Sequence, residues 1–330
     1  MADGTAVLGL DVGGTWTRAL VAGVDGARLG AARRAGANPL AHGVGAAAVH
    51  IGEAVAEALA VAEVEASGVR ACVVGMAGAS KLAADPEAAG AFAELWKQVG
   101  LGCEVEIVAD VTTAYAAGSA AADGVVLLAG TGAVAATMRG RRPATVHGGH
   151  GWLLGDEGSG YWIGREAVRA TLAALDDGAG ASGNLMKAVL AAYGAEPVGH
   201  GTARPGAGLI AAVNARPAVE LAAIVPLVVA AYEDGDPVAE RIVADAAEAL
   251  VRLLARARAA SESGPIVLAG GVLTPGSCVY EAVCTTIGEA WPGASVAAGV
   301  DGVAAAVWLA ALRLLGDGAE ARDLHGRLVG

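Results

Sequence analysis

The chain has 330 residues, of which 55% are hydrophobic, so it is long enough for two domains with separate cores. Its formal net charge is -12 at pH 7 and no basic stripe is present, which argues against a nucleic-acid partner. No basic region of a signal peptide precedes Val7–Leu10, and the apolar stretch near Leu221–Tyr232 is interrupted by Pro226. The four cysteines lack C-x-x-C spacing. We therefore expect a cytoplasmic protein with free thiols and no membrane partner.

Apolar runs and glycine turns in the first third of the chain predict alternating strands and helices. A strand, a glycine turn and a second strand come first, and a long helix with apolar residues at helical spacing follows the third strand. We expect strands at Ala6–Leu10, Thr17–Val24, Arg28–Ala35, Ala71–Gly75 and Val105–Val108, and helices at Val44–Ala66, Pro86–Val99 and Val111–Ala121.

The same strand, glycine turn and strand then occur a second time. Strands are expected at Val125–Ala129, Ala133–Arg139, Ile266–Ala269 and near Val296, with helices over much of Gly158 to Ser261, at Ser277–Ala290 and at Val303–Leu315; Arg139–Arg142 and Gly178–Gly183 are expected as surface loops. We interpret the repetition as an internal duplication in an α/β protein, with domains at 1–118 and 119–330 and the last helix as a candidate to pack on the first domain. The alternative is one large α/β domain with decorations.

Two of the glycine turns are suited to binding phosphate. Asp11-Val12-Gly13-Gly14-Thr15 offers backbone N–H donors, with the hydroxyls of Thr15 and Thr17 beside them, and Gly130-Thr131-Gly132 offers a second such turn. Neither matches G-x-x-x-x-G-K-[ST] or G-x-G-x-x-G, and each precedes a strand rather than a helix. Taken alone, a turn such as Asp11–Thr15 favours a plain hairpin, because glycine turns join most hairpins. Two of them opening two similar halves, with a third at Gly270-Gly271, favour a nucleotide site.

Two aspartates stand at the ends of predicted strands. Asp11 closes the first strand, where a carboxylate can hold a hydrated Mg²⁺ next to phosphate oxygens; the alternative is an Asx-type turn. Asp110 follows Val105–Val108 and precedes a helix. It is a candidate general base that takes the proton of an attacking hydroxyl. The alternative is helix N-capping through Asp110 or Thr112, and the local sequence does not separate the two.

The block from Gly148 to Gly164 concentrates seven glycines, two adjacent acids and three aromatic residues in a chain that is only 4% aromatic. Glycines let a backbone approach a ligand closely, and acids grip hydroxyls, so the block predicts a polar small-molecule site. Asp156 and Glu157 precede a helix, where a helix-dipole role is the alternative. Trp152, Tyr161 and Trp162 are expected to pack beneath the loop. The roles of His147, His150 and Glu157 stay open.

These motifs, in this order, resemble those of the actin/hexokinase/Hsp70 superfamily of ATPases. Within it the chain resembles the BadF/BadG/BcrA/BcrD-type group, and most closely the N-acetylglucosamine kinases. The specific part is Gly-Gly-x-Gly-x-x-x-Gly-Asp-Glu-Gly-Ser-x-Tyr-Trp-Ile, beginning at Gly148, whereas the phosphate turns and Leu268-Ala269-Gly270-Gly271-Val272 are superfamily features. The resemblance spans roughly residues 6–300.

The resemblance implies two ribonuclease-H-like (actin-like ATPase) domains with ATP in the interdomain cleft. Asp11 would support Mg²⁺ and Asp110 would be the catalytic base. The nucleotide would be held by Asp11, Gly13, Gly14, Thr15, Thr17, Gly130, Thr131 and Gly132, with Gly270 and Gly271 against the nucleoside. The sugar would contact Asn38, Asp110, Gly148, Gly149 and Asp156. Without the family, the favoured interpretation of Asn38 is a turn residue ahead of Pro39.

The implied activity is an ATP-dependent kinase acting on the primary (6-)hydroxyl of an amino sugar, with N-acetylglucosamine or glucosamine expected first. Pro39-Leu40 and Met76-Ala77-Gly78 depart from the family pattern, which leaves N-acetylmuramic acid and glucose open. A homodimer is a hypothesis. The rival is an ATPase activator that passes an electron to a 2-hydroxyacyl-CoA dehydratase or benzoyl-CoA reductase through an iron–sulfur cluster. Cys278 and Cys284, six residues apart on a predicted helix, do not share one face for that role.

Overall fold

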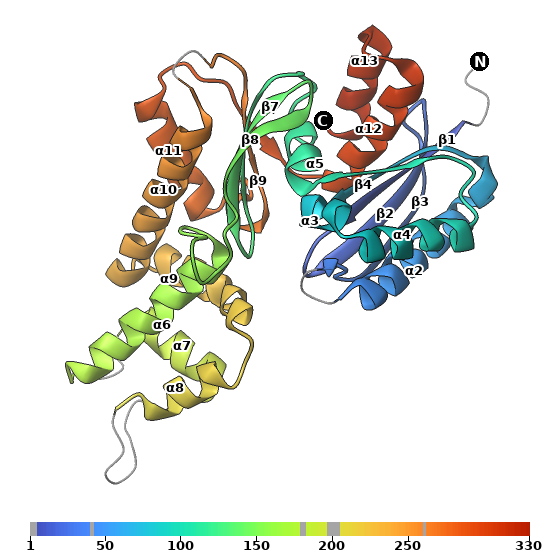
Figure 1. The fold of residues 1–330 in the computed structure, drawn as a ribbon. Helices are drawn as coiled ribbons and strands as arrows, with labels where there is room; N and C mark the ends of the chain where they lie inside the picture. The colour runs from blue at the N-terminus through green and yellow to red at the C-terminus, as the bar shows by residue number, and fades with distance from the viewer. Residues whose placement is uncertain (1–4, 40–42, 179–182, 197–204, 260–261) are drawn as a thin grey trace. The chain divides into compact units, whose positions relative to one another are not determined.

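The computed structural model describes residues 5–39, 43–178, 183–196, 205–259 and 262–330. By their contacts the residues form two compact units (Figure 1). Unit 1 comprises residues 1–123, 138–143 and 299–330, and unit 2 comprises residues 124–137 and 144–298. The C-terminal residues 299–330 thus cluster with the N-terminal part of the chain. The expected domain division between residues 118 and 119 stays a prediction.

Unit 1 is built on a five-stranded sheet in the order β3-β2-β1-β4-β5. The pairs β1–β2 and β2–β3 are antiparallel, whereas β1–β4 and β4–β5 are parallel, which is the ribonuclease-H-like arrangement. Its strands are β1 (Ala6–Val12), β2 (Trp16–Gly23), β3 (Arg28–Ala35), β4 (Val69–Met76) and β5 (Val105–Ala109). The ends of the parallel strands place Asp11 and Asp110 at one edge of this sheet.

Helices cover both faces of the first sheet, and each face has its own core (Figure 1). The helices α2 (Val44–Ala62) and α4 (Pro86–Val99) lie on one face, while α12 (Gly302–Leu315) packs on β1 and β4 from the other. Since β1 is enclosed on both faces, its sequence is a continuous apolar run rather than an alternating one. The remaining helices of unit 1 are η1 (Ala66–Gly68), α3 (Ala79–Ala84), α5 (Asp110–Ala116) and α13 (Ala319–Leu328).

Unit 2 repeats the strand order. Its sheet runs β8-β7-β6-β9-β10, so β6 takes the place of β1, and β9 pairs in parallel with β6. The strands are β6 (Gly124–Ala129), β7 (Ala133–Arg139), β8 (Arg142–Gly148), β9 (Ile266–Ala269) and β10 (Val296–Gly299). The repetition confirms the α/β class with two actin-like ATPase halves. The segment expected as a loop at Arg139–Arg142 is a tight hairpin turn, with positive φ at Gly140 and Arg141, and β8 follows it.

A single large core holds the helices of unit 2 on its sheet. The long helix α10 (Pro237–Ala257) and α6 (Gly160–Asp176) supply much of it, and their N-caps are Asp236 and Ser159. The other helices are α7 (Asn184–Tyr193), α8 (Ala207–Asn214), η2 (Ala218–Ile224), α9 (Val225–Glu233), η3 (Gly271–Leu273) and α11 (Cys278–Ala290). Part of the expected loop Gly178–Gly183 lies outside the described residues.

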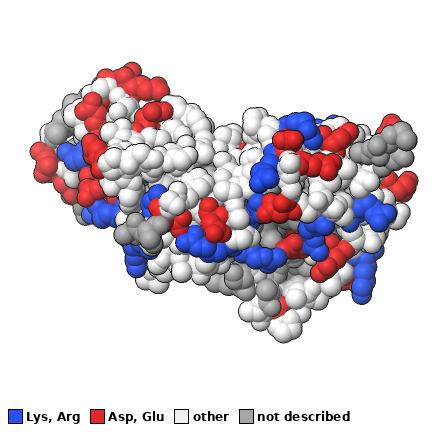
Figure 2. Space-filling view, turned by 90° about the horizontal axis from the view of Figure 1, so that it is seen from above, with Lys and Arg blue, Asp and Glu red and all other residues white. Residues whose placement is uncertain are grey.

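By length and composition, α2 is apolar enough to cross a membrane, and so is the bent pair of Ala207–Asn214 with Ala218–Glu233. In the structure α2 packs against β2 and β3 through one face. Its buried face, which includes Ile51 and Val55, packs on the first sheet, and Arg34 of β3 forms ion pairs with Glu53 and Glu57 on its polar face. On the face shown in Figure 2, basic and acidic side chains are interspersed.

Candidate functional site

The first glycine turn, between β1 and β2, is closed by a hydrogen bond from the Gly13 N–H to the Trp16 carbonyl oxygen at 2.9 Å. Gly14 and Thr15 are exposed at its tip. The segment after β3 is packed against this turn: the Ala37 N–H donates to the Gly13 carbonyl at 3.1 Å, and a Cβ on Gly36 would overlap the Gly14 carbonyl. The half-buried Asn38 follows directly, so the structure brings its loop to the first turn.

Asp11 lies on the α12 face of this hairpin. The Arg18 guanidinium is 3.6 Å from its carboxylate, and a Cβ on Gly302, at the start of α12, would lie 3.1 Å from Oδ2. Burial raises the pKa of Asp11 to about 6. The Arg18 charge opposes this shift, and the carboxylates of Asp110 and Asp301 add to it. The site therefore concentrates negative charge that a bound cation would neutralise.

Thr17 faces the other way. In the β1–β2 register Asp11 is opposite Arg18 and Val12 is opposite Thr17, so Thr17 projects from the opposite face of the hairpin to Asp11. Its side chain is fully buried, and its hydroxyl has no hydrogen-bond partner among the described residues. The exposed donors of this turn are those of Gly14 and Thr15; the role of Thr17 toward nucleotide stays a prediction.

Asp110 is the first residue of α5, directly after β5. Its Oδ1 accepts the Val111 N–H at 2.9 Å, while the N-cap position is held by Ala109 and Thr112 is buried within the helix. Burial raises the pKa of Asp110, although its backbone hydrogen bonds act in the opposite direction. Asp110 thus combines proximity to Asp11 with a carboxylate of increased basicity, which suits a general base.

The second turn, Gly130-Thr131-Gly132, joins β6 to β7 and is held by the start of α6. The Gly160 N–H donates to the Gly130 carbonyl at 2.8 Å, and the Tyr161 N–H donates to the Thr131 carbonyl at 3.2 Å. The turn also closes on itself through the Gly130 N–H and the Gly132 carbonyl. None of these hydrogen bonds uses the N–H groups of Thr131 and Gly132, which are therefore candidate donors to phosphate oxygens.

The glycine-rich loop reaches the same turn through Asp156. The Asp156 Oδ1 accepts the Ala133 N–H at 3.1 Å, and a Cβ on Gly132 would lie 2.8 Å from Oδ2. Asp156 is only 8% exposed and has a φ of 63°, a left-handed conformation that aspartate and asparagine tolerate better than most residues. Burial raises its pKa; the Ala133 N–H and His150 oppose the shift, whereas Glu157 adds to it. One carboxylate thus links the predicted sugar loop to the predicted phosphate turn.

The rest of the loop divides into a packed part and an exposed part. Tyr161 and Trp162 join the core of unit 2, whereas Trp152 is 41% exposed and meets Tyr161 with ring centroids 5.7 Å apart. Leu153 and Leu154 are exposed at the tip. Gly148 and Gly149 have positive φ, and the Gly149 N–H donates to the Ala133 carbonyl, so they lie beside β7.

The third glycine turn follows β9. Gly270 has a φ of 97°, and a Cβ there would overlap the backbone of Ala129 at the end of β6. Only glycine permits this approach, which brings Gly270 and Gly271 beside the start of the second turn. Unit 2 therefore gathers the second turn, Asp156 and the Gly270-Gly271 turn at one edge of its sheet.

Residues 8–312 match the BadF/BadG/BcrA/BcrD ATPase family, which is nearly the whole chain. The chain belongs to this ATPase family. Its fold is similar to that of a candidate N-acetylglucosamine kinase from Chromobacterium violaceum, with a TM-score of 0.70 and 22% identity over 98% of this chain and 99% of that one. A second candidate N-acetylglucosamine kinase, from Porphyromonas gingivalis, has a TM-score of 0.67 and 24% identity over 89% and 93%.

Among curated proteins, the chain is 31% identical over 83 residues to the N-acetylmuramic acid/N-acetylglucosamine kinase of Clostridium acetobutylicum. That stretch is 25% of this chain and 27% of the relative, so the match spans about a quarter of the relative's length. Membership of this family implies that the chain uses ATP.

Four residues that the structure places at this candidate site were not predicted from the sequence. Gly36 fixes the Asn38 loop against the first turn, and Arg18 neutralises part of the Asp11 charge. Asp301 caps α12 and Gly302 lies against Asp11. The Asp-Gly pair before an apolar helix signals only an N-cap, because nothing in the sequence shows that α12 returns to β1. Leu40, one of the departures from the family pattern, lies outside the described residues.

Proposed function

We propose that the protein is an ATP-dependent sugar kinase that phosphorylates the primary (6-)hydroxyl of an amino sugar, with N-acetylglucosamine or glucosamine as the expected acceptor. The observation that carries the proposal is the pairing of turn and carboxylate in both units. Each unit sets a glycine turn beside an aspartate whose pKa burial raises: Asp11 with Asp110 in unit 1, and Asp156 in unit 2.

The residues present fit a nucleotide. The exposed tip Gly14-Thr15 and the N–H groups of Thr131 and Gly132 supply backbone donors for phosphate oxygens, as an acidic chain without a P-loop lysine requires. Gly270-Gly271, at the edge of the same sheet as the second turn, would contact the nucleoside.

The residues also fit Mg²⁺ through Asp11. Burial raises its pKa, and the neighbouring carboxylates of Asp110 and Asp301 add to the shift, so a cation would stabilise its charged form. Mg²⁺ bound by one carboxylate, phosphate oxygens and waters needs no cluster of three protein ligands. No such cluster of histidine, cysteine or acidic side chains occurs within the described residues. When bound, the ion would stabilise negative charge on the transferred phosphoryl group.

The acceptor sugar would be bound by Asn38 and Asp110 of unit 1 and by Gly148, Gly149 and Asp156 of unit 2. Asp110 takes the proton of the sugar hydroxyl as its oxygen attacks the γ-phosphorus in line, and ADP leaves. The raised pKa of Asp110 makes it a better base than an exposed aspartate. Loss of a general base typically lowers the rate by about 10²–10⁴-fold.

The deciding experiment measures ADP release with Mg-ATP in the presence of glucosamine, N-acetylglucosamine, N-acetylmuramic acid, N-acetylmannosamine or glucose. We expect stimulation by an amino sugar in the wild type. Asp110→Asn should lower turnover by at least about 10²-fold while ATP binding is kept. Asp323→Asn, at an exposed position of α13 in the same unit, is the matched control and should leave turnover unchanged.

Phosphorus NMR of the product and a 6-deoxy analogue test the acceptor oxygen. The product should carry a 6-phosphate, and the 6-deoxy sugar should bind without accepting phosphate. If protein that binds ATP releases ADP without stimulation by any sugar of the panel, the kinase proposal fails for these acceptors, and the electron-transfer ATPase becomes the leading hypothesis.

A further inference from the structure

The peptide group between Gly36 and Ala37, just after β3, is held from two sides. Its N–H, which belongs to Ala37, donates to the Gly13 carbonyl at 3.1 Å. Its carbonyl, which belongs to Gly36, lies 3.2 Å from Nδ1 of His50 on α2. Since a carbonyl oxygen can only accept a hydrogen bond, Nδ1 of His50 is the donor. This peptide group therefore links the first glycine turn to α2.

The helix α2 is a firm support for this contact. Ala47 and Ala54, about one turn before and one turn after His50, are fully buried in the core on this face of the sheet. Glu57, two turns after His50 on the same face of the helix, forms an ion pair with Arg34 of β3. The helix thus holds the end of β3 through Arg34 and the segment that follows it through His50.

The hydrogen bond from His50 fixes a part of the backbone that has little other restraint. Gly36 must lack a side chain because of the Gly14 carbonyl, and glycine has the greatest backbone freedom of all residues. A peptide group is planar, so its carbonyl and its N–H turn together. Fixing the Gly36 carbonyl therefore also fixes the direction of the Ala37 N–H toward Gly13 and the path of the chain into Asn38.

We propose that His50 is a positioning residue of the kinase site, which holds both the Asn38 loop and the first glycine turn through the Gly36–Ala37 peptide group. The inference rests on the proposed function, in which Asn38 contacts the sugar and the turn contacts the nucleotide. One side chain on α2 thus supports the parts of unit 1 that bind the two substrates. His50 itself contacts neither substrate.

The first test does not depend on the acceptor sugar. Hydrogen exchange of a peptide spanning residues 33–39, in the whole protein without ligands, reports the Ala37 amide. In His50→Ala its protection should fall by about three- to tenfold, the usual effect of losing one neutral hydrogen bond. The Kd of ATP without sugar, measured by calorimetry, should rise by a similar factor because the first turn loses its support.

The second test is the split between KM and kcat. In His50→Ala, KM for the sugar and KM for ATP should both rise by about three- to tenfold. The change in kcat should be less than about twofold, because Asp110 stands on α5 and does not depend on this peptide group. Absence of turnover in the wild type would count against the kinase proposal, and the exchange measurement would still decide the role of His50.

His50→Asn separates positioning from a general effect on the helix. The asparagine Nδ2 is attached to Cγ, as Nδ1 of histidine is, so it can donate to the Gly36 carbonyl. We expect His50→Asn to restore exchange, Kd and KM to within about twofold of the wild type. Alanine is a better helix former than asparagine, so an effect on the stability of α2 alone would place the two variants in the opposite order.

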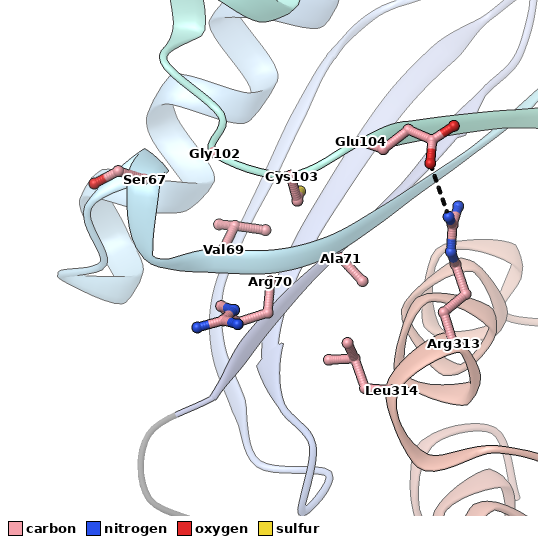
Figure 3. Close-up of a pocket in the computed structure, with 9 residues that line it drawn as sticks. All are labelled: Ser67, Val69, Arg70, Ala71, Gly102, Cys103, Glu104, Arg313 and Leu314. Atoms are coloured by element: carbon pink, nitrogen blue, oxygen red, sulfur yellow. Dashed lines mark hydrogen bonds and ion pairs between the residues drawn. The ribbon is translucent and has the colours of Figure 1, made fainter.

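The control is Arg70→Gln, in the same unit but at the other end of the sheet. Arg70 lies near the start of β4 beside a cavity of about 500 Å³, and its guanidinium points away from Arg313 and Glu104 (Figure 3). This variant should leave exchange at Ala37 and both KM values unchanged. The inference is overturned if Ala37 exchanges in His50→Ala as it does in the wild type, or if His50→Asn is as impaired as His50→Ala.

Discussion

The hydrogen bond from the Ala133 N–H to Asp156 joins the glycine-rich loop to the second glycine turn. We therefore expect the asparagine and alanine substitutions of Asp156 to have different effects. Asp156→Asn keeps an oxygen to accept the Ala133 N–H and keeps a residue that tolerates the left-handed backbone at 156. Asp156→Ala loses both. If Asp156 only contacts the sugar, the two variants should behave alike; if it also holds the turn, the alanine variant should lose more.

The size of the difference follows from the contacts. A hydrogen bond to a charged group contributes about 1.5–3 kcal/mol, and its loss leaves a donor without its protein partner. The left-handed backbone conformation costs alanine as much as about 1 kcal/mol more than it costs aspartate, which tolerates this conformation better. We expect Asp156→Ala to destabilise the turn locally by about 2–4 kcal/mol, and Asp156→Asn by about 1 kcal/mol or less.

Hydrogen exchange of a peptide spanning residues 130–136 reports the Ala133 amide directly. Its protection should fall by at least about 30-fold in Asp156→Ala and by less than about tenfold in Asp156→Asn. In kinase assays, KM for the sugar should rise in both variants, whereas KM for ATP should rise mainly in Asp156→Ala. Asp177→Ala, at the exposed end of α6, is the control. Unchanged exchange and unchanged KM for ATP in Asp156→Ala would refute the link.

Two further predictions concern unit 1. Because the pKa of Asp11 is raised to about 6 from its usual 3.8, the folded chain binds its proton more tightly than the unfolded chain does, and this stabilisation is lost as the pH rises through about 6. In chemical unfolding without nucleotide, Asp11→Asn should therefore stabilise the chain by about 1–3 kcal/mol at pH 8 and hardly at pH 4; equal effects at both pH values would contradict the electrostatic reading. Gly36→Ala should displace the Gly14 carbonyl and raise KM for ATP at least about tenfold, whereas Gly45→Ala, whose Cβ would meet nothing within 4 Å, should not; equal ATP kinetics in the two would argue against this packing.

Helices and strands could be predicted from the sequence wherever an apolar run, a helical spacing of apolar residues or a flanking turn marks them. Arg28–Ala35, Pro86–Val99, Ala133–Arg139 and Ile266–Ala269 were predicted with their observed bounds. The strand β8 was missed because its residues are mostly exposed and polar residues interrupt the apolar ones, so no apolar run marks it. The helix α13 was missed for a similar reason: only Ala321, Leu324 and Leu328 are buried, and the stripe is short. Local patterns therefore fail where an element contributes little to a core.

The candidate site was predictable to the extent that its residues stand beside glycine turns or at the ends of predicted strands. Asp11, Asp110 and Asp156 were each marked by their position in the chain. Gly36 was not marked in this way. Only glycine fits there because the Gly14 carbonyl lies where a Cβ would be, and Gly14 is distant in sequence but close in the fold. The second role of Asp156, toward the Ala133 N–H, likewise depends on a contact between residues 23 positions apart.

Two aspartates of unit 2 differ in how many hydrogen-bond donors surround their buried carboxylates. Asp236 and Asp156 are almost equally buried, at 7% and 8% exposed. Burial acts to raise the pKa of Asp236, but the N–H groups of Leu185, Val238 and Ala239 together lower it below its usual value. Asp156 accepts one N–H, and burial raises its pKa.

A carboxylate with only a structural role is most stabilising when it accepts hydrogen bonds from all nearby donors, as the N-cap Asp236 does. The single N–H donor at Asp156 leaves its burial only partly compensated, and the burial of Asp11 and Asp110 likewise costs stability. A sugar hydroxyl at Asp156 and Asp110, and a cation at Asp11, would each offset part of that cost. Binding of sugar and Mg-ATP should therefore raise the Tm of the wild-type protein more than that of Asp11→Asn, in which part of the cost is already removed.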